Sequence, residues 1–320
     1  MLEVRSPGLH ATIQDAGRPG LGHLGIPPAG ACDPLALAAA NLLLGNEPGA
    51  PVLEMTLLGA ELHVHAPCLV ALTGAEMDAV VPEDGRRLRP GTTHRLRAGS
   101  SLVLGAARTG ARAYLALAGG IEAARVLGSA STAPTGRIGA RPLGPGDLLR
   151  PVEPARLDPA GRAWPGPGPA SGVAPHAGPR TIRLLDGPHA TELPRAAIRL
   201  RYPAAWTVTP RSDRAGLRLA GPVLPPADGP EPVSFGMTWG ALELPSGGAP
   251  ILLLADHPTV GGYRVPAVAI SADRPALGQL QAGDEVRFAR VDAATAARLA
   301  TEAADALAVA AARLAAPDRP

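Results

Sequence analysis

The chain has 320 residues, of which 46% are hydrophobic and 18% charged, and its formal net charge is +2 at pH 7. This length allows two ordinary domains or one large one, with a core that needs no disulfide or metal staples. Only 2% of the residues are aromatic, so the chain lacks both the stacking side chains and the strong positive field of a nucleic-acid-binding protein.

Short apolar runs bounded by Gly and Pro recur along the whole chain, which contains 39 Gly and 37 Pro. Such short runs predict strands more readily than helices, so the expected fold is mainly β. One helix is predicted over 34–44, with Asp33 as its N-cap, Pro34 in its first turn and Gly45 just after its end. The runs predicted as strands include 69–72, 114–118, 182–185, 251–254 and 265–270.

A proline-rich stretch divides the chain. Residues 151–180 include eight prolines, and because proline fixes φ and lacks an N–H donor, this stretch is expected to stay off any sheet as an extended, mobile linker. The predicted domains are a β-rich domain at 1–150 and a β-barrel domain at 181–291. Residues 292–320 are expected to form a C-terminal helix, capped by Asp292, and a tail.

The two parts end in a similar pattern. Residues 143–150 and 280–287 share the motif L-x-x-G-D-x-(L/V)-R. A Gly-Asp turn that feeds an outgoing strand is a common way to close a small barrel. The echo is compatible with two barrel-like units, and also with a chance match.

All 30 basic residues are arginine. Without lysine the chain has no P-loop lysine, no Schiff-base amine and no site for covalent biotin or lipoate. Cys32 and Cys68 form no C-x-x-C motif, so no zinc knuckle or disulfide framework is predicted. No leader sequence is evident and no apolar run approaches the ~18 residues of a membrane span. A soluble, cytoplasmic protein is expected.

Two glycine-containing segments of the second part carry candidate chemistry. In 255–263, Asp256 and His257 precede Gly261 and Gly262, which let backbone N–H groups approach an anion, and Tyr263 follows. An Asp-His pair can equally cap a turn.

The other such segment, 211–216, holds Ser212 between two arginines, and arginine binds carboxylates and phosphates in bidentate fashion. The alternative is a surface arginine with a local Asp partner, worth ~0–1 kcal/mol.

Two further segments lie in the first part: 12–18 with Gln14, Asp15 and Arg18, followed by Asp33, and 128–132. The hydroxyls of 128–132 suggest a nucleophile, but the chain has no G-x-S-x-G elbow, which favours a turn whose hydroxyls satisfy the backbone. His63 and His65 alternate on one predicted strand, yet no third ligand has a telling spacing, so no metal site is predicted.

These segments, in this order, resemble the KipA family, also known as the PxpC-type subunit of 5-oxoprolinase or as allophanate hydrolase subunit 2. That family is similar in turn to the carboxyltransferase region of urea carboxylase. The matching stretches, which span about residues 1–290, are TIQDAGR (12–18), GACD (30–33), ANLLLGN (40–46), LEMT (53–56), ALTGA (71–75), RAYLALAGGI (112–121), GSAST (128–132), SDRAGLRL (212–219) and TVGGY (259–263).

The resemblance implies a fold with cyclophilin-like barrels and a protein that works with a KipI-like (PxpB-type) and a LamB/YcsF-like (PxpA-type) subunit. Such a complex opens 5-oxo-L-proline to L-glutamate with ATP, through phosphorylation of the lactam oxygen. ATP contact would then use arginines, backbone N–H groups and a shared interface.

The resemblance also implies roles for particular residues. Asp256, His257, Tyr263 and Glu243 are expected near the chemistry. The expected ligand-binding residues are Arg214, Arg218, Ser212, Gly261, Gly262, Gln14, Asp15, Arg18 and Asp33.

Three positions depart from the family pattern: Glu243 and Ala249 stand where the family usually has Gln, and Ala215 stands where it has Met. A carboxylate at position 243 adds negative charge and loses two donors. Two alternatives stay open. The resemblance to urea carboxylase suggests a biotin-dependent carboxyltransferase component served by carboxybiotin on another protein, and Glu243 and Ala215 suggest a non-enzymatic KipA-like regulatory binding protein.

Overall fold

A computed structural model describes residues 1–134, 136–154, 157, 160–166, 178–193, 202, 204–225 and 230–316. The chain divides into two compact units. Unit 1 comprises Met1–Arg18, Ala29–Pro175 and Ala304–Pro320, and unit 2 comprises Pro19–Pro28 and His176–Ala303. The domain limits expected from composition, at 150, 180 and 291, stay predictions.

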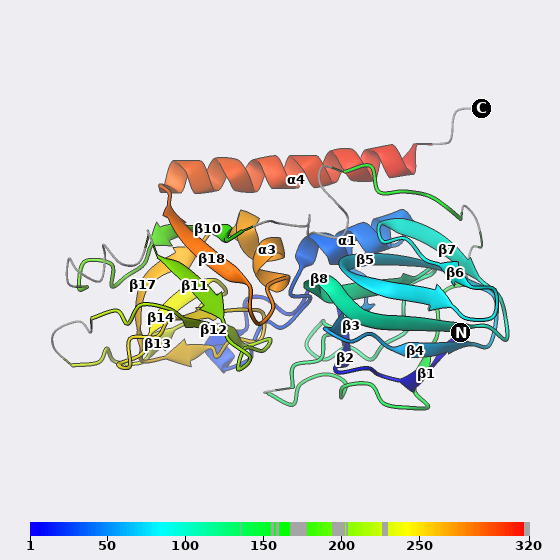
Figure 1. Cartoon of the computed structure of the whole chain (residues 1–320), viewed down its shortest axis with the longest axis horizontal. Coiled ribbons are helices and arrows are strands. Elements are labelled where there is room, and N and C mark those ends of the chain that lie inside the picture. Colours follow the sequence, from blue (N-terminus) through cyan, green and yellow to red (C-terminus); the bar gives the residue numbers. More distant parts are fainter. Residues whose placement is uncertain are drawn as a thin grey trace. The chain divides into compact units, whose positions relative to one another are not determined.

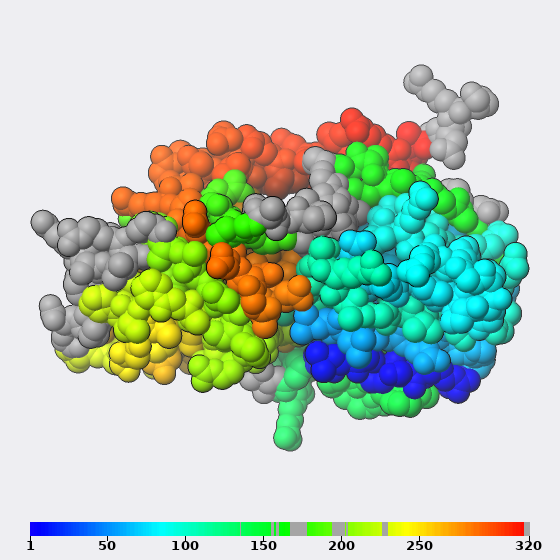
Figure 2. Space-filling view, viewed as in Figure 1, coloured from blue at the N-terminus to red at the C-terminus, as the bar shows by residue number. Residues whose placement is uncertain are grey.

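Unit 1 is built on a nine-stranded sheet (Figure 1). Its main path runs through β2 (Ala11–Gln14), β3 (Val52–Thr56), β8 (Ser101–Leu117), β4 (Glu61–Val64), β1 (Leu2–Ser6) and β9 (Leu148–Leu149). The long strand β5 (Cys68–Val81) pairs antiparallel with β8 and also with β6 (Arg86–Arg87) and β7 (Thr92–Leu96). Figure 2 shows the cyan segment that includes β6 and β7 at the surface of this unit.

Helix α1 (Pro34–Leu43) forms as the sequence predicts. The Asp33 side chain accepts a hydrogen bond from the Ala36 N–H at 2.9 Å, which satisfies one donor of the first turn. After the helix, Gly45 adopts φ +72°, a conformation that favours glycine. The apolar face of α1 packs against buried residues of β8, among them Tyr114 and Ala116.

Unit 2 contains a closed barrel of seven strands. Their order is β10 (Arg180–Asp186), β17 (Arg264–Ala269), β14 (Ala241–Leu244), β15 (Ile251–Leu253), β12 (Gly216–Ala220), β11 (Ala205–Val208) and β18 (Glu285–Arg290). The barrel closes through β10 and β18, which run parallel. A separate two-stranded sheet joins β13 (Phe235–Gly236) to β16 (Val260–Gly261). The mainly β prediction is thus confirmed, with a nine-stranded sheet in unit 1 and a closed barrel and a two-stranded sheet in unit 2.

The described helices include one that the sequence analysis missed. Helix α3 (Arg274–Gly278) follows the 3₁₀ turn η2 (Ser271–Asp273), and its five residues are too few to show a helical period. A second 3₁₀ turn, η1, spans Gly22–Leu24. Helix α4 (Ala293–Ala315) begins as predicted, since the Asp292 side chain accepts a hydrogen bond from the Thr295 N–H at 2.8 Å. No helix in the described ranges combines the length and hydropathy needed to cross a membrane.

The repeated Gly-Asp motif forms the same turn in both units. Gly146 and Gly283 adopt φ values of +88° and +93°. In each turn the following Asp accepts a hydrogen bond from the backbone N–H three residues earlier, at 2.8 Å in unit 1 and 3.0 Å in unit 2. Each turn leads directly into a strand, β9 or β18. The local turn prediction is confirmed, while the sheets that the two turns enter differ in topology.

The proline-rich stretch does not stay off the sheet. Ala163 forms a bridge with Thr92, and Pro151 forms one with Ile121. The prediction was wrong at these points because a proline still has a carbonyl acceptor and its non-proline neighbours keep their N–H donors. Residues 155, 156, 158, 159 and 167–177 of the predicted linker lie outside the described residues.

Candidate functional site

A buried ion pair joins the two candidate segments of unit 2. Arg214 precedes β12 and Asp256 follows β15, and the backbone pairing of these strands continues past their ends, since the Asp256 N–H donates to the Arg214 carbonyl at 3.0 Å. The guanidinium meets the carboxylate in a bidentate geometry, with Nε–Oδ2 at 2.8 Å and Nη2–Oδ1 at 3.0 Å. Both side chains are buried, so each depends on the other for its stability in the interior.

His257 follows the ion pair and is also buried. Its Nδ1 lies 2.8 Å from the Pro258 carbonyl oxygen, which can only accept, so Nδ1 carries the proton. Burial lowers the pKa of His257, and the positive charge of Arg274 lowers it further, against the opposite effects of Pro258 and Asp256. The imidazole is therefore neutral at pH 7, and its Nε2 lone pair can act as a base.

Glu243 lies on β14 and is only 5% exposed. Burial raises the pKa of this carboxyl. Its Oε1 approaches Gly261 so closely that a Cβ on that glycine would come within 2.9 Å of it and within 2.5 Å of Met237 Cε. The structure thus places Glu243 next to Gly261. The sequence analysis had named both as candidate site residues, and the missing side chain of glycine allows this close approach.

Among the remaining predicted residues of unit 2, Arg218 and Tyr263 are exposed, whereas Ser212 and Gly262 are partly buried. Arg218 is exposed, and its backbone N–H donates to the Ser212 hydroxyl at 3.0 Å. Tyr263 is 43% exposed. A Cβ atom added to Gly262 would meet its nearest neighbours at ordinary contact distance, so there is space for a side chain at this position. Their roles in binding or catalysis stay predictions.

In unit 1, Asp15 is the centre of a buried network. Its carboxylate accepts hydrogen bonds from the hydroxyls of Ser129 and Ser131, at 2.6 and 2.5 Å, and from two backbone N–H groups, those of Ala130 and Gly17. Burial alone would raise the pKa of Asp15, but these four hydrogen bonds together lower it below its ordinary value. The serine oxygens do satisfy backbone groups, as predicted, whereas their protons go to a carboxylate that the sequence did not pair with them.

Two of the other predicted residues of unit 1, Arg18 and Gln14, lie beside this network. Arg18 donates to the Ser131 carbonyl at 2.6 Å, and Gln14 donates to the Thr132 carbonyl at 2.9 Å. Asp33 caps α1. All three bonds hold the chain's own backbone in place, and ligand binding by these residues stays a prediction.

A buried group that the sequence analysis did not single out joins β3 to β8. Glu54 and Tyr114 face each other in the register of the two strands, and the phenol donates to the carboxylate at 2.9 Å. The same carboxylate accepts from the Cys32 N–H at 3.0 Å, and the phenol oxygen accepts from the Asp33 N–H at 2.8 Å. The sequence does not show which residues face each other on neighbouring strands, so this pairing could not be predicted. The one indication in the sequence was that Glu54 and Tyr114 both lie within stretches that match the KipA family.

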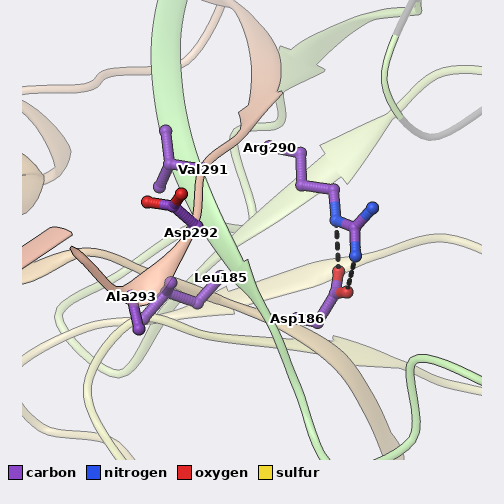
Figure 3. Close-up of a pocket in the computed structure, with 6 residues that line it drawn as sticks. All are labelled: Leu185, Asp186, Arg290, Val291, Asp292 and Ala293. Carbon is purple, nitrogen blue, oxygen red and sulfur yellow. Dashed lines mark hydrogen bonds and ion pairs between the residues drawn. The ribbon is translucent and has the colours of Figure 1, made fainter. Parts of the chain in front are cut away.

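Two cavities lie away from these groups. One, of about 640 Å³, is lined by Leu185, Asp186, Arg290, Val291, Asp292 and Ala293. Figure 3 shows the Arg290 guanidinium facing the Asp186 carboxylate, so the charges of this pair neutralise each other. The other, of about 700 Å³, lies in unit 1 beside Asn46 and Gly119. Neither is lined by a predicted site residue. Within the described ranges, no group of three or more His, Cys, Asp or Glu side chains is placed to hold a metal ion.

Comparison with known proteins identifies the family. Residues 24–290 match the family described as "Carboxyltransferase domain, subdomain A and B". The chain is 35% identical to the C-subunit of 5-oxoprolinase from Escherichia coli over 90% of this chain and 90% of that protein. The chain belongs to this carboxyltransferase-domain family.

Members of the family also occur within much longer proteins. The chain is 31% identical to urea amidolyase of Lachancea kluyveri over 89% of its own length, which is 17% of that enzyme. The crystal structure of Kluyveromyces lactis urea carboxylase matches 97% of this chain and 29% of that one, with a TM-score of 0.84 and 28% identity. The domain is therefore found both as a separate chain and as part of a larger enzyme.

Proposed function

We propose that this chain is a non-autonomous subunit of an ATP-dependent 5-oxoprolinase, which converts 5-oxo-L-proline to L-glutamate. The observation that carries the proposal is the 35% identity to the C-subunit of the Escherichia coli 5-oxoprolinase over nine-tenths of both chains. The name of that relative implies further subunits, and we propose partners of the KipI-like and LamB/YcsF-like types.

The chemistry has to overcome the stability of a lactam. Transfer of the γ-phosphoryl group of ATP to the lactam oxygen releases ADP and gives an imidate phosphate. Water then adds to the imidate carbon and gives up a proton to a base. The ring C–N bond breaks as nitrogen takes a proton, and a second water hydrolyses the acyl phosphate to glutamate and phosphate.

His257 is the residue that we propose as the base. A neutral imidazole whose Nδ1 proton is held by the Pro258 carbonyl presents Nε2 to accept a proton. The Arg214–Asp256 ion pair holds the backbone immediately before His257 in place, and so positions the imidazole. Because the Arg214 charge is already neutralised by Asp256, we assign this pair to positioning, although the family resemblance had suggested Arg214 as a ligand.

The proposal is tested by reconstitution. The full chain is combined with its partner subunits, and glutamate release from 5-oxoproline and ATP is measured with and without this chain. Omission is expected to abolish turnover, and an unchanged rate without it would refute the proposal. His257→Asn is expected to lower kcat by about 100-fold or more, as for loss of a general base. The matched control is His94→Asn, a partly buried histidine with a lowered pKa, which lies in unit 1 and is expected to keep the activity.

A second candidate, a biotin-dependent carboxyltransferase component, is favoured by the family match and by the likeness to urea carboxylase. Since the chain has no lysine, carboxybiotin would arrive on another protein. Incubation with a carboxylated carrier and urea or a small amide tests it, and the absence of carboxyl transfer would rule it out.

A further inference from the structure

Arg274, at the start of α3, stacks on an aromatic ring in unit 2. Its guanidinium carbon lies 4.9 Å from the centroid of the Trp239 ring. The ring itself packs against the barrel core and is therefore held in place. This arrangement fixes a planar cation on a rigid support.

The guanidinium has no acidic partner among the described residues. The neighbouring carboxylate, Asp273, is taken up by Arg183, whose backbone N–H and side chain both donate to it. The Nε of Arg274 is buried and makes no hydrogen bond in the described chain. Burial lowers the pKa of Arg274, because it removes part of the charge from water.

A second unused donor lies in the same place. The indole N–H of Trp239 is buried and makes no hydrogen bond with a described residue. An indole nitrogen can only donate. These two donors belong to a set of ten buried side-chain polar atoms without a hydrogen-bond partner in the described residues. Because the two lie on side chains that contact each other, an acceptor from outside the chain would complete their hydrogen bonding.

The charge of Arg274 also lowers the pKa of His257, as the smallest of four influences on that imidazole. The other influences on the pKa of that imidazole are its own burial, the Pro258 carbonyl and Asp256. Arg214 and Arg290 form ion pairs with Asp256 and Asp186. Arg274 forms no ion pair with a described residue, so its own charge is not neutralised by a carboxylate of the described chain.

We propose that Arg274 and Trp239 form an oxyanion-binding subsite of unit 2. Its ligand is a carboxylate or phosphoryl oxygen, which would accept hydrogen bonds from the guanidinium and the indole. The identification of that anion with a group of the 5-oxoprolinase substrates rests on the proposed function, whereas the subsite itself does not.

The test uses the isolated full-length chain, without turnover. Binding of inorganic phosphate and of 5-oxo-L-proline is measured by calorimetry, and the pKa of His257 is followed by NMR with and without each probe. Arg274→Met is expected to weaken binding by about tenfold or more, as for loss of a charge-assisted hydrogen bond. Trp239→Phe keeps an aromatic ring, removes the N–H, and is expected to weaken binding about threefold.

The NMR readout separates a binding role from a packing role. In the wild-type chain a bound anion is expected to raise the pKa of His257 because it neutralises Arg274. Arg274→Met should raise that pKa without any ligand and abolish the response to the probes. Arg287→Met removes an exposed arginine of the same unit and serves as the matched control, with wild-type binding expected.

A response to phosphate alone assigns the subsite to a phosphoryl group, and a response to 5-oxoproline alone assigns it to a carboxylate. If neither probe binds, or if Arg274→Met and Trp239→Phe both bind as the wild type does, the subsite does not exist. An inactive reconstituted complex with intact anion binding would refute the proposed function and leave the subsite standing.

Discussion

Arg214 and Asp256 are 42 residues apart in the chain, yet their side chains form a bidentate pair in the interior of unit 2. Neither residue is stable there without the other, since a lone buried charge loses its hydration without compensation. The pair therefore forms only when the segment that leads to His257 is correctly folded.

Replacement of Arg214 by Met should lower the free energy of unfolding by about 3 kcal/mol, because it leaves Asp256 buried without its counter-ion. Chemical denaturation measures this loss. Arg211→Met, at an exposed position three residues earlier, should change the free energy by less than about 0.5 kcal/mol. Equal effects of the two substitutions would mean that the buried pair contributes nothing specific.

Asp15 predicts a pH dependence of stability. Its pKa is lower in the folded chain than the ordinary 3.8, so the folded state favours the carboxylate. The resulting stabilisation is fully present above the unfolded pKa and is lost as the pH falls through the folded pKa. Unfolding free energy measured from pH 6 down to the acid limit should fall more steeply in the wild type than in Asp15→Asn. Asp305→Asn, at an exposed position on α4, should retain the wild-type slope.

At the scale of elements, the glycine immediately before β14 is required by both its backbone conformation and the space around it. Gly240 has φ +89°, and a Cβ there would lie 2.9 Å from the backbone oxygen of Ala269 on β17. Gly283 has a similar φ of +93° in the turn before β18, but nothing lies within 4 Å of its Cβ position. Substitution of Gly283 therefore tests backbone strain alone, whereas substitution of Gly240 tests strain together with a steric clash.

Gly283→Ala should cost about 1–2 kcal/mol of stability through the strained φ alone. Gly240→Ala should cost more than this, because the oxygen that it meets belongs to the backbone of a paired strand and cannot move aside. Thermal and denaturant unfolding of both variants provide the comparison. A Gly240→Ala loss no larger than that of Gly283→Ala would show that β17 yields to the new methyl group.

Elements with local signals were predicted well. The cap, proline and glycine around α1 and the cap of α4 lie within a few residues of the helices they delimit, so the sequence shows them directly. The full lengths of β5 and β8, 14 and 17 residues, were missed because glycines interrupt their apolar pattern, while the sheet tolerates register shifts at those points.

At the scale of the whole molecule, the absence of lysine makes a prediction for the carboxyltransferase alternative. A biotin protein ligase should leave the full chain without biotin on a streptavidin blot, because the modification requires a lysine amine. A known biotin carrier protein in the same reaction is the control. Biotin found covalently on this chain would contradict the prediction and require another attachment chemistry.

The sequence by itself determined the mainly β class, the helix caps, the Gly-Asp turns and the family, because each depends on residues that are adjacent in the chain or on motifs in a fixed order. Only the tertiary structure decided which charges meet. Asp15 bonds to serines more than 110 residues away, Arg214 pairs with Asp256, and Asp273 pairs with Arg183 rather than with the adjacent Arg274. Strand register and barrel closure set these distances, and no local pattern encodes them.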